Sequence, residues 1–396
     1  MLSTTTVPVS DHSTDQLKPS SQSKRFPWLD MAKAYGIFLV YYGHFVEEIL
    51  EYKEFAVETA AYQQYKCIYA FHMPLFFMLS GFVYKHKEQP LGSFLYQKVL
   101  TRIVPALFFN ILALGIYFLD HLVRGNNGFA ENYSVPSILV DVLTGYPFSN
   151  FITWFLFCLF TVELLNHSVY PFIKDNLWKS VGLAILTLLV GYYLVGLNQT
   201  LKSSLPLRGL DTWYLNSSLI GLSFYQLGFI LKQSNIVAWF EQPLHKYVGL
   251  VITLVATVTT FNLNQGPFLD PRGIVALAVT SYGNLFLFVT TAIIGSLFII
   301  LLSLSLPSVK GVVFFGKNTL ILLGMNFLYV NIATPIIGKL DPSIFESWVT
   351  VTLFTLGLTL VSFLVNVPII QLINRLVPQL MGKPEAKGPL LPALLR

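Results

Sequence analysis

Long apolar segments recur along almost the whole chain, and they limit its fold more than any other feature. Apolar residues make up 54% of the sequence and charged residues only 11%, more apolar surface than a soluble core could cover. A membrane-spanning helix needs roughly 20 mainly apolar residues. The sequence therefore predicts an all-α fold, a polytopic membrane helix bundle with about ten spans, at 31–50, 66–84, 99–120, 151–172, 178–197, 210–231, 246–262, 284–306, 318–338 and 346–371.

The apolar stretch "GIVALAVTSYG", residues 273–283, is too short to span a bilayer. We expect an interfacial piece, a re-entrant piece or a short eleventh element there. Placing the N-terminus in the cytoplasm puts most of the 25 Lys and Arg residues on the inner side, so both termini are predicted to be cytoplasmic. This gives a disordered cytoplasmic tail at 1–25, a membrane domain at 26–376 and a cytoplasmic C-terminal tail at 377–396. The polar start of the chain does not have the pattern of a cleavable signal peptide.

Several common site motifs are missing from the sequence. The two cysteines, Cys67 and Cys158, lie in apolar segments and form no metal-binding pattern. We find no HExxH sequence, no phosphate-binding glycine loop and no stripe of basic and aromatic residues. The sequence thus predicts no metal site, no bound cofactor and no nucleic-acid partner.

Two histidines lie inside the first two apolar spans. His72, in "AFHMPLFFMLSGF", lies about 12 residues, roughly 18 Å, from the inner end of its span. His44 lies 11 residues beyond Lys33, roughly 16 Å from the same side. Polar groups in membrane spans usually face the protein interior or a water-filled cavity. We therefore expect both imidazoles at a similar depth; a structural hydrogen bond between helices is the alternative for either one alone.

Lys33 and His44 share one face of their helix. Eleven residues at 100° each amount to only about 20° beyond three full turns, so both side chains project in the same direction. This stripe would place a cation at the cytoplasmic mouth and an imidazole deep inside. The alternative for Lys33 is a residue that anchors the helix end by snorkelling.

Three blocks of residues resemble acyltransferase family 3, the integral-membrane acyltransferases of sugars, lipids and surface polysaccharides. They are "RFPWLDMAKAYGIFLVYYGHF", "FHMPLFFMLSGFVYK" and "KVLTRIVPALFF". Weaker blocks follow in order as "TWFLFCLFTVELL", "DTWYLNSSLIGLSFYQLGFIL" and "FFGKNTLILLGMNFLYV". The likeness spans about residues 26–372 and is nearest to the fucose O-acetylase-like branch of sugar O-acetyltransferases.

The resemblance implies transfer of an acyl group, most often acetyl from acetyl-CoA as co-substrate, to a hydroxyl of an extracytoplasmic sugar, polysaccharide or lipid-linked glycan. It also implies a multi-pass protein of the bacterial inner membrane. A hydroxyl is a poor nucleophile at neutral pH, and an imidazole can act as its general base. We assign that role to His44. His72 would orient the base, bind substrate or handle a second proton, and an acyl-imidazole on either histidine remains open.

Coenzyme A carries several phosphate charges, which basic side chains bind by charge-assisted hydrogen bonds. Lys33, Lys98 and Arg102 are the candidates; Lys98 and Arg102 are four apart and share a helix face. The alternative for Lys98 and Arg102 is that they only belong to the general excess of basic residues on the cytoplasmic side.

Further polar or aromatic residues in or beside the spans are candidates for supporting or acceptor-binding roles. Asp30 is one helical turn from Lys33 and can pair with it. Where many relatives have a histidine, this chain has Asn326, which cannot act as a base. Trp154 can anchor the helix at the interface instead, and Asn110 can make an interhelical hydrogen bond. The complete set is Asp30, Glu163, Asn110, Trp154, Asp211, Trp213 and Asn326.

The strongest rival function is a transporter or flippase of a glycan or lipid-linked sugar, in which membrane histidines relay protons. Inverted repeats or spans broken at corresponding positions would favour it, and neither is evident in the sequence. The sequence allows a homo-oligomer but does not indicate one.

Overall fold

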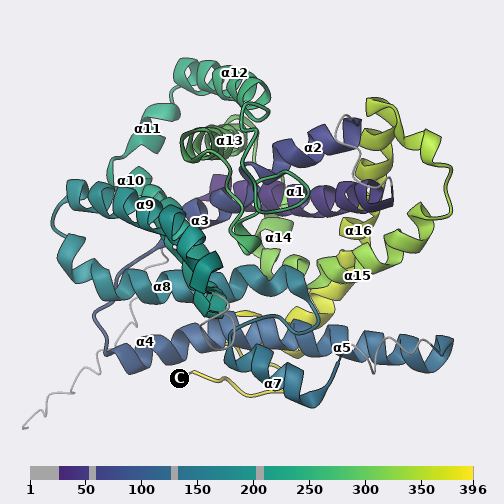
Figure 1. Ribbon diagram of the computed structural model, residues 1–396. Helices are drawn as coiled ribbons and strands as arrows, with labels where there is room; N and C mark the ends of the chain where they lie inside the picture. The colour runs from purple at the N-terminus through teal and green to yellow at the C-terminus, as the bar shows by residue number, and fades with distance from the viewer. Residues whose placement is uncertain (1–25, 53–58, 126–132, 202–208, 396) are drawn as a thin grey trace, which may run out of the picture.

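The computed structural model describes residues 26–52, 59–125, 133–201 and 209–395. Over these residues the chain is a bundle of helices without a β-strand, so the prediction of an all-α fold is confirmed (Figure 1). The predicted tail at 1–25 lies outside the described residues.

The helices of the first half of the chain end with the long α9. They are α1 (Pro27–Tyr52), α2 (Ala60–Tyr69), α3 (His72–Val83), α4 (Leu91–Lys98), α5 (Val104–Arg124), α7 (Val135–Leu143), α8 (Trp154–Ile173) and α9 (Leu177–Leu201). The second half contributes α10 (Leu215–Gln233), α11 (Ile236–Phe240), α12 (Pro243–Thr260), α13 (Leu285–Ser305), α14 (Lys310–Lys317), α15 (Thr319–Ile337) and α16 (Trp348–Leu376).

Seven helical stretches among the described residues are long and apolar enough to cross a membrane. They are Ala60–Val83, Leu91–Val123, Phe151–Ile173, Leu177–Thr200, Leu285–Ser305, Thr319–Ile337 and Trp348–Leu376. Helices also form at the other three predicted stretches, as α1, α10 and α12. These are less apolar, since α1 carries Asp30 and Lys33, for example, and α10 carries several serines. The count of about ten spans and the position of the termini remain predictions.

Helix α1 is at the centre of the bundle. It packs against α2, α3, α13, α14, α15 and α16, and most of its residues are buried (Figure 1). At its start, the carbonyl oxygen of Asp30 lies so close to Gly316 of α14 that a Cβ on this glycine would come within 1.7 Å. A helix held by this many neighbours gives fixed positions to the side chains along it.

The predicted span 66–84 is not one helix. It breaks at Ala70 and Phe71, and α3 begins at His72. Pro74 explains the break, because proline has no N–H group to continue a helix but is accepted in a first turn. His72 therefore lies at a helix start inside the membrane domain.

A second irregularity joins α4 to α5. Val99–Ile103 forms a π-helical turn, which displaces the face that carries Lys98 and Arg102. Pro105 follows at the second position of α5 and cannot donate to the carbonyl of Thr101. The Arg102 guanidinium donates to this carbonyl instead, at 3.1 Å.

Residues 273–283 form no further α-helix. They belong to the connection between α12 and α13 and fold as a short turn, η4 (Leu277–Val279), inside a bridge between Ala276 and Ser281. Ile274, Val275 and Leu277 are buried, so this connection enters the bundle.

The C-terminal residues 377–395 fold back onto the bundle, since Gln379 is fully buried and donates to the carbonyl of Leu391 at 2.5 Å.

Helices α3 and α10 approach each other through two glycines. A Cβ on Gly81 would lie 1.8 Å from the carbonyl oxygen of Tyr225, and one on Gly228 would lie 1.8 Å from that of Met78. Small residues of this kind let helix backbones pack closely in a membrane.

Replacing Gly81 or Gly228 with alanine should therefore push the two helices apart. We expect each change to destabilise the protein by about 1–3 kcal/mol, as overpacking does, and to lower the midpoint of thermal unfolding in detergent. Gly182→Ala in α9 is the control, because its Cβ would meet no atom within 4 Å. Equal unfolding midpoints for Gly81→Ala and Gly182→Ala would contradict the close approach.

Candidate active site

One face of α1 lines three cavities in a row. Lys33 lines a basic pocket of about 420 Å³, and His44 lines a histidine pocket of about 370 Å³. Between them, Ile37 and Val40 line a cavity of about 80 Å³, here called the waist. Positions 33, 37, 40 and 44 lie on one face of a helix, because they are three or four residues apart. The sequence predicts this common face for Lys33 and His44, at its two ends.

The three cavities share walls. The basic pocket and the waist have Phe76, Phe155 and Thr319 in common. The waist and the histidine pocket share three other residues, Val40, Met73 and Leu323. The three cavities therefore adjoin one another along α1, with two larger ones that carry charged and polar side chains and a small, mainly apolar one between them.

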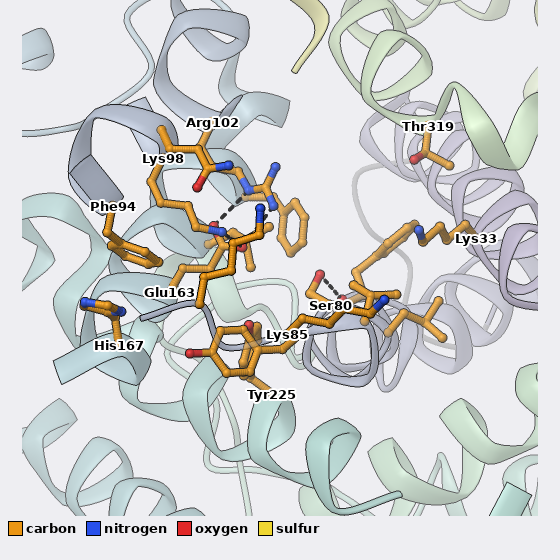
Figure 2. A pocket seen from close by; sticks show the side chains of 18 of the residues that line it. Lys33, Ser80, Lys85, Phe94, Lys98, Arg102, Glu163, His167, Tyr225 and Thr319 are labelled. Carbon is orange, nitrogen blue, oxygen red and sulfur yellow. Dashed lines mark hydrogen bonds and ion pairs between the residues drawn. The ribbon is translucent and has the colours of Figure 1, made fainter. Parts of the chain in front are cut away.

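Glu163 joins the two predicted cations of the third span. Its Oε1 lies 2.8 Å from Lys98 Nζ and 2.9 Å from Arg102 Nη2, and its Oε2 accepts from Arg102 Nε at 3.0 Å (Figure 2). The Glu163 side chain is only 6% exposed, whereas those of Lys98 and Arg102 are 17% and 27% exposed. One buried carboxylate thus holds two cations at the pocket wall and compensates one of their charges.

Further cations complete the basic pocket. Lys33 lies across the pocket from Arg102, with Lys85 between the two sides (Figure 2). With Lys87, five basic side chains and one carboxylate line it, a formal charge of +4. The pocket is suited to a ligand with several negative charges.

His44 belongs to a polar network in the histidine pocket. Its Nδ1 lies 2.9 Å from Glu47 Oε2, one helical turn along α1. Tyr69 donates to the same carboxylate oxygen at 2.9 Å, and Tyr65 donates to Oε1 at 2.9 Å. Arg272 forms an ion pair with Glu47 from the connection between α12 and α13. An ionised Glu47 accepts the proton on Nδ1, which leaves the His44 Nε2 lone pair available as a base.

His72 has its own fixed tautomer. Its Nδ1 lies 2.9 Å from the carbonyl oxygen of Ile68, so Nδ1 carries the proton and Nε2 does not. The interaction occurs where α3 restarts at His72, and the same carbonyl also accepts from the backbone N–H of Phe71 at 3.2 Å. Tyr69 lies between the histidines, with its ring 4.7 Å from that of His72 and 6.3 Å from that of His44.

Asp270 holds Arg272 in place. Its Oδ2 lies 2.7 Å from Arg272 Nη2, and its Oδ1 accepts from both Nε and the backbone N–H of Arg272. Burial raises the pKa of the Asp270 carboxyl and lowers the pKa of the Arg272 guanidinium. Both pKa shifts reflect the cost of removing a charged group from water. The ion pair between the two side chains offsets this cost.

Sequence reasoning missed Glu47, Tyr69 and Arg272. Glu47 follows His44 by three residues, a spacing that brings side chains together on a helix, so this signal was present. Arg272 is 225 positions from Glu47, and no local pattern connects them.

Among the supporting candidates, Trp154 lines the histidine pocket. Asn110 does not line any of the three cavities; it donates to Thr153 Oγ1 and accepts from the backbone of Ser149 and Asn150, and so holds the segment before Trp154. Asn326 is fully buried, and its side-chain atoms have no hydrogen-bond partner among the described residues.

The other three do not line the histidine pocket. Asp30 is buried at the start of α1. Asp211 accepts from the Asn198 amide at 2.9 Å and lines a different cavity. The Trp213 indole donates to the Leu143 carbonyl at 3.1 Å and so ties the segment before α10 to the end of α7. Among the described residues, no three His, Cys, Asp or Glu side chains are grouped to hold a metal ion.

These features define a multi-pass integral membrane protein with an internal site between a basic end and a histidine end. The family model described as an acyltransferase domain matches residues 26–367, and the chain belongs to this family, acyltransferase family 3. It is thus a membrane O-acyltransferase. No match was found among curated proteins or among solved structures.

Glu163→Gln should destabilise the protein, because it removes the charge that compensates Lys98 and Arg102. A fully buried pair would lose about 3–5 kcal/mol when one partner is removed; with both cations partly exposed we expect about 2 kcal/mol. Thermal unfolding in detergent measures this, with the exposed Glu241→Gln as control. Equal unfolding midpoints would show that the carboxylate does not hold the cations.

Proposed function

We propose that the protein transfers an acetyl group from acetyl-CoA to a hydroxyl of an extracytoplasmic sugar, polysaccharide or lipid-linked glycan. The observation that carries this is the row of cavities along α1, with cations at one end and histidines at the other. A negatively charged donor and an uncharged hydroxyl need these two environments.

The donor would bind with its phosphates in the basic pocket. Lys33, Lys98 and Arg102 supply charge-assisted hydrogen bonds there. The waist would hold the thin pantetheine arm, and Lys33 and His44 are roughly 16 Å apart along α1, at 1.5 Å per residue. The thioester would then reach the histidine pocket while the phosphates remain at the other end.

His44 would act as the general base. Its Nε2 takes the proton of the acceptor hydroxyl, whose oxygen attacks the thioester carbonyl carbon. The tetrahedral intermediate collapses with cleavage of the C–S bond, and the thiolate of coenzyme A takes the proton from His44. Glu47 positions the imidazole and stabilises its protonated form, and Arg272 positions Glu47. His72, with Nε2 unprotonated, would accept a hydrogen bond from a second hydroxyl of the acceptor.

A transporter or flippase would need a passage wide enough for a sugar. The waist, at about 80 Å³ with mainly apolar walls, is suited to a thin chain rather than a glycan. This observation favours transfer over transport.

His44→Ala should lower acetyl transfer by at least about 100-fold, as expected for loss of a general base. Membranes with wild type or variant would receive radiolabelled acetyl-CoA, with membrane lipids and glycans as acceptors. His245→Ala, in a half-buried position on α12 that lines none of the three cavities, is the control and should keep wild-type activity. Normal activity of His44→Ala would refute the base assignment, and coenzyme A binding without transfer in wild type would redirect the search to another acyl chain or acceptor.

Lys98→Met should raise the KM for acetyl-CoA about tenfold, since a hydrogen bond between charged groups contributes about 1.5–3 kcal/mol. The same variant should hardly change the reaction with S-acetylpantetheine, which lacks the nucleotide phosphates. Lys179→Met, at an exposed position at the start of α9, is the matched control. A similar loss with both donors would assign Lys98 to the structure of the pocket rather than to phosphate binding.

A further inference from the structure

A further cavity adjoins the histidine pocket. It has a volume of about 480 Å³ and is here called the tyrosine cavity, after Tyr146 and Tyr214 in its wall. It shares Ala278 and Val279 with the histidine pocket. The two cavities thus adjoin at one short turn. The proposed reaction does not use the second one, although Asp211, a candidate from the sequence, lines it.

Several hydrogen bonds hold the turn at which the two cavities adjoin. Backbone hydrogen bonds between Ala276 and Ser281 close it at 2.8 and 3.0 Å. Ser217 of α10 donates to the carbonyl of Leu277 at 2.7 Å, and the Ser281 hydroxyl donates to that of Ile274 at 2.9 Å. The relative position of the two cavities is therefore set by the fold.

Aromatic rings connect the two cavities. Tyr146 and Tyr214 lie nearly parallel, at an interplanar angle of 9° with centroids 5.6 Å apart. Tyr214 is 5.7 Å from Trp154, which lines the histidine pocket. Flat rings offer large apolar faces at low entropic cost, and the C–H faces of sugars pack well on such surfaces.

Polar side chains surround the tyrosines. Asn198 donates to Asp211 at 2.9 Å and accepts from the backbone N–H of Leu210 at 3.0 Å, so both side chains have a fixed orientation. Gln199 and Thr280 complete the polar wall. Amides, hydroxyls and a carboxylate bind hydroxyl groups well.

The charges of the tyrosine cavity differ from those of the basic pocket. Among the described residues that line it there is one carboxylate, Asp211, and no lysine, arginine or histidine. Phosphates and acidic sugars would be repelled there, so an uncharged ligand rich in hydroxyl groups fits it.

We propose that the tyrosine cavity is a second sugar subsite. The acceptor is then at least a disaccharide of neutral sugars: one unit presents its hydroxyl to His44, and the neighbouring unit binds between Tyr146, Asp211 and Gln199. This inference rests on the proposed function and adds the size and charge of its acceptor.

The test compares acceptors of two lengths. Radiolabelled acetyl-CoA is supplied to the full-length protein with methyl glycosides of neutral sugars, or with disaccharides that end in the same sugars. For a sugar that accepts label, we expect kcat/KM of the disaccharide to exceed that of its methyl glycoside about tenfold or more, the effect of one or two additional hydrogen bonds.

Variants then locate the effect. Gln199→Trp would fill the cavity and Asp211→Asn would remove its charge, and both should bring the ratio of the two kcat/KM values close to one. Gln233→Ala, at an exposed position at the end of α10, should keep the wild-type ratio. A wild-type ratio of one, or an unchanged ratio in both cavity variants, would overturn the subsite but not the proposed function. No label in any sugar would overturn the proposed acceptor class, and the subsite with it.

Discussion

Charged side chains inside a membrane domain must be paired, and this constraint explains the arrangement of the site. An unpaired charge in the bilayer core costs several kcal/mol. Glu163 binds Lys98 and Arg102 and compensates one of their two charges at one end of the row of cavities, and Arg272 pairs with Glu47 at the other. Each cluster draws its members from different helices or connections. The same contacts that make the charges tolerable therefore also fix the charged side chains within each pocket.

Breaks in regular helix geometry occur where the site needs them. Helix α3 restarts at His72, and a π-helical turn carries Arg102. Backbone groups freed by such breaks need partners inside a membrane domain. Here Arg102 donates to the carbonyl of Thr101, and His72 adds a second donor to the carbonyl of Ile68, which also accepts from the backbone of Phe71. In both places a proline follows within three residues, which links the irregularity to the sequence.

The connection between α12 and α13 shapes the proposed acceptor side of the site. The connection between α12 and α13 supplies Arg272 to the histidine pocket, and its short turn forms the wall shared with the tyrosine cavity. A change in this connection would affect the orientation of His44 through Glu47, and also the shape of both cavities. Variation there is thus a physical route by which proteins of this fold can alter the histidine pocket without altering the basic pocket.

The sequence by itself determined the all-helical membrane class, the common face of Lys33 and His44 and the closeness of Lys98 to Arg102, because these follow from composition and from the 3.6-residue repeat. It also contained the His44–Glu47 spacing, whose meaning was missed. Only the tertiary structure decided that Glu163 binds both cations, that Arg272 reaches Glu47 and that a second cavity lies beyond Ala278. Those relations join segments far apart in the chain, and helix periodicity contains no information on which helices pack together.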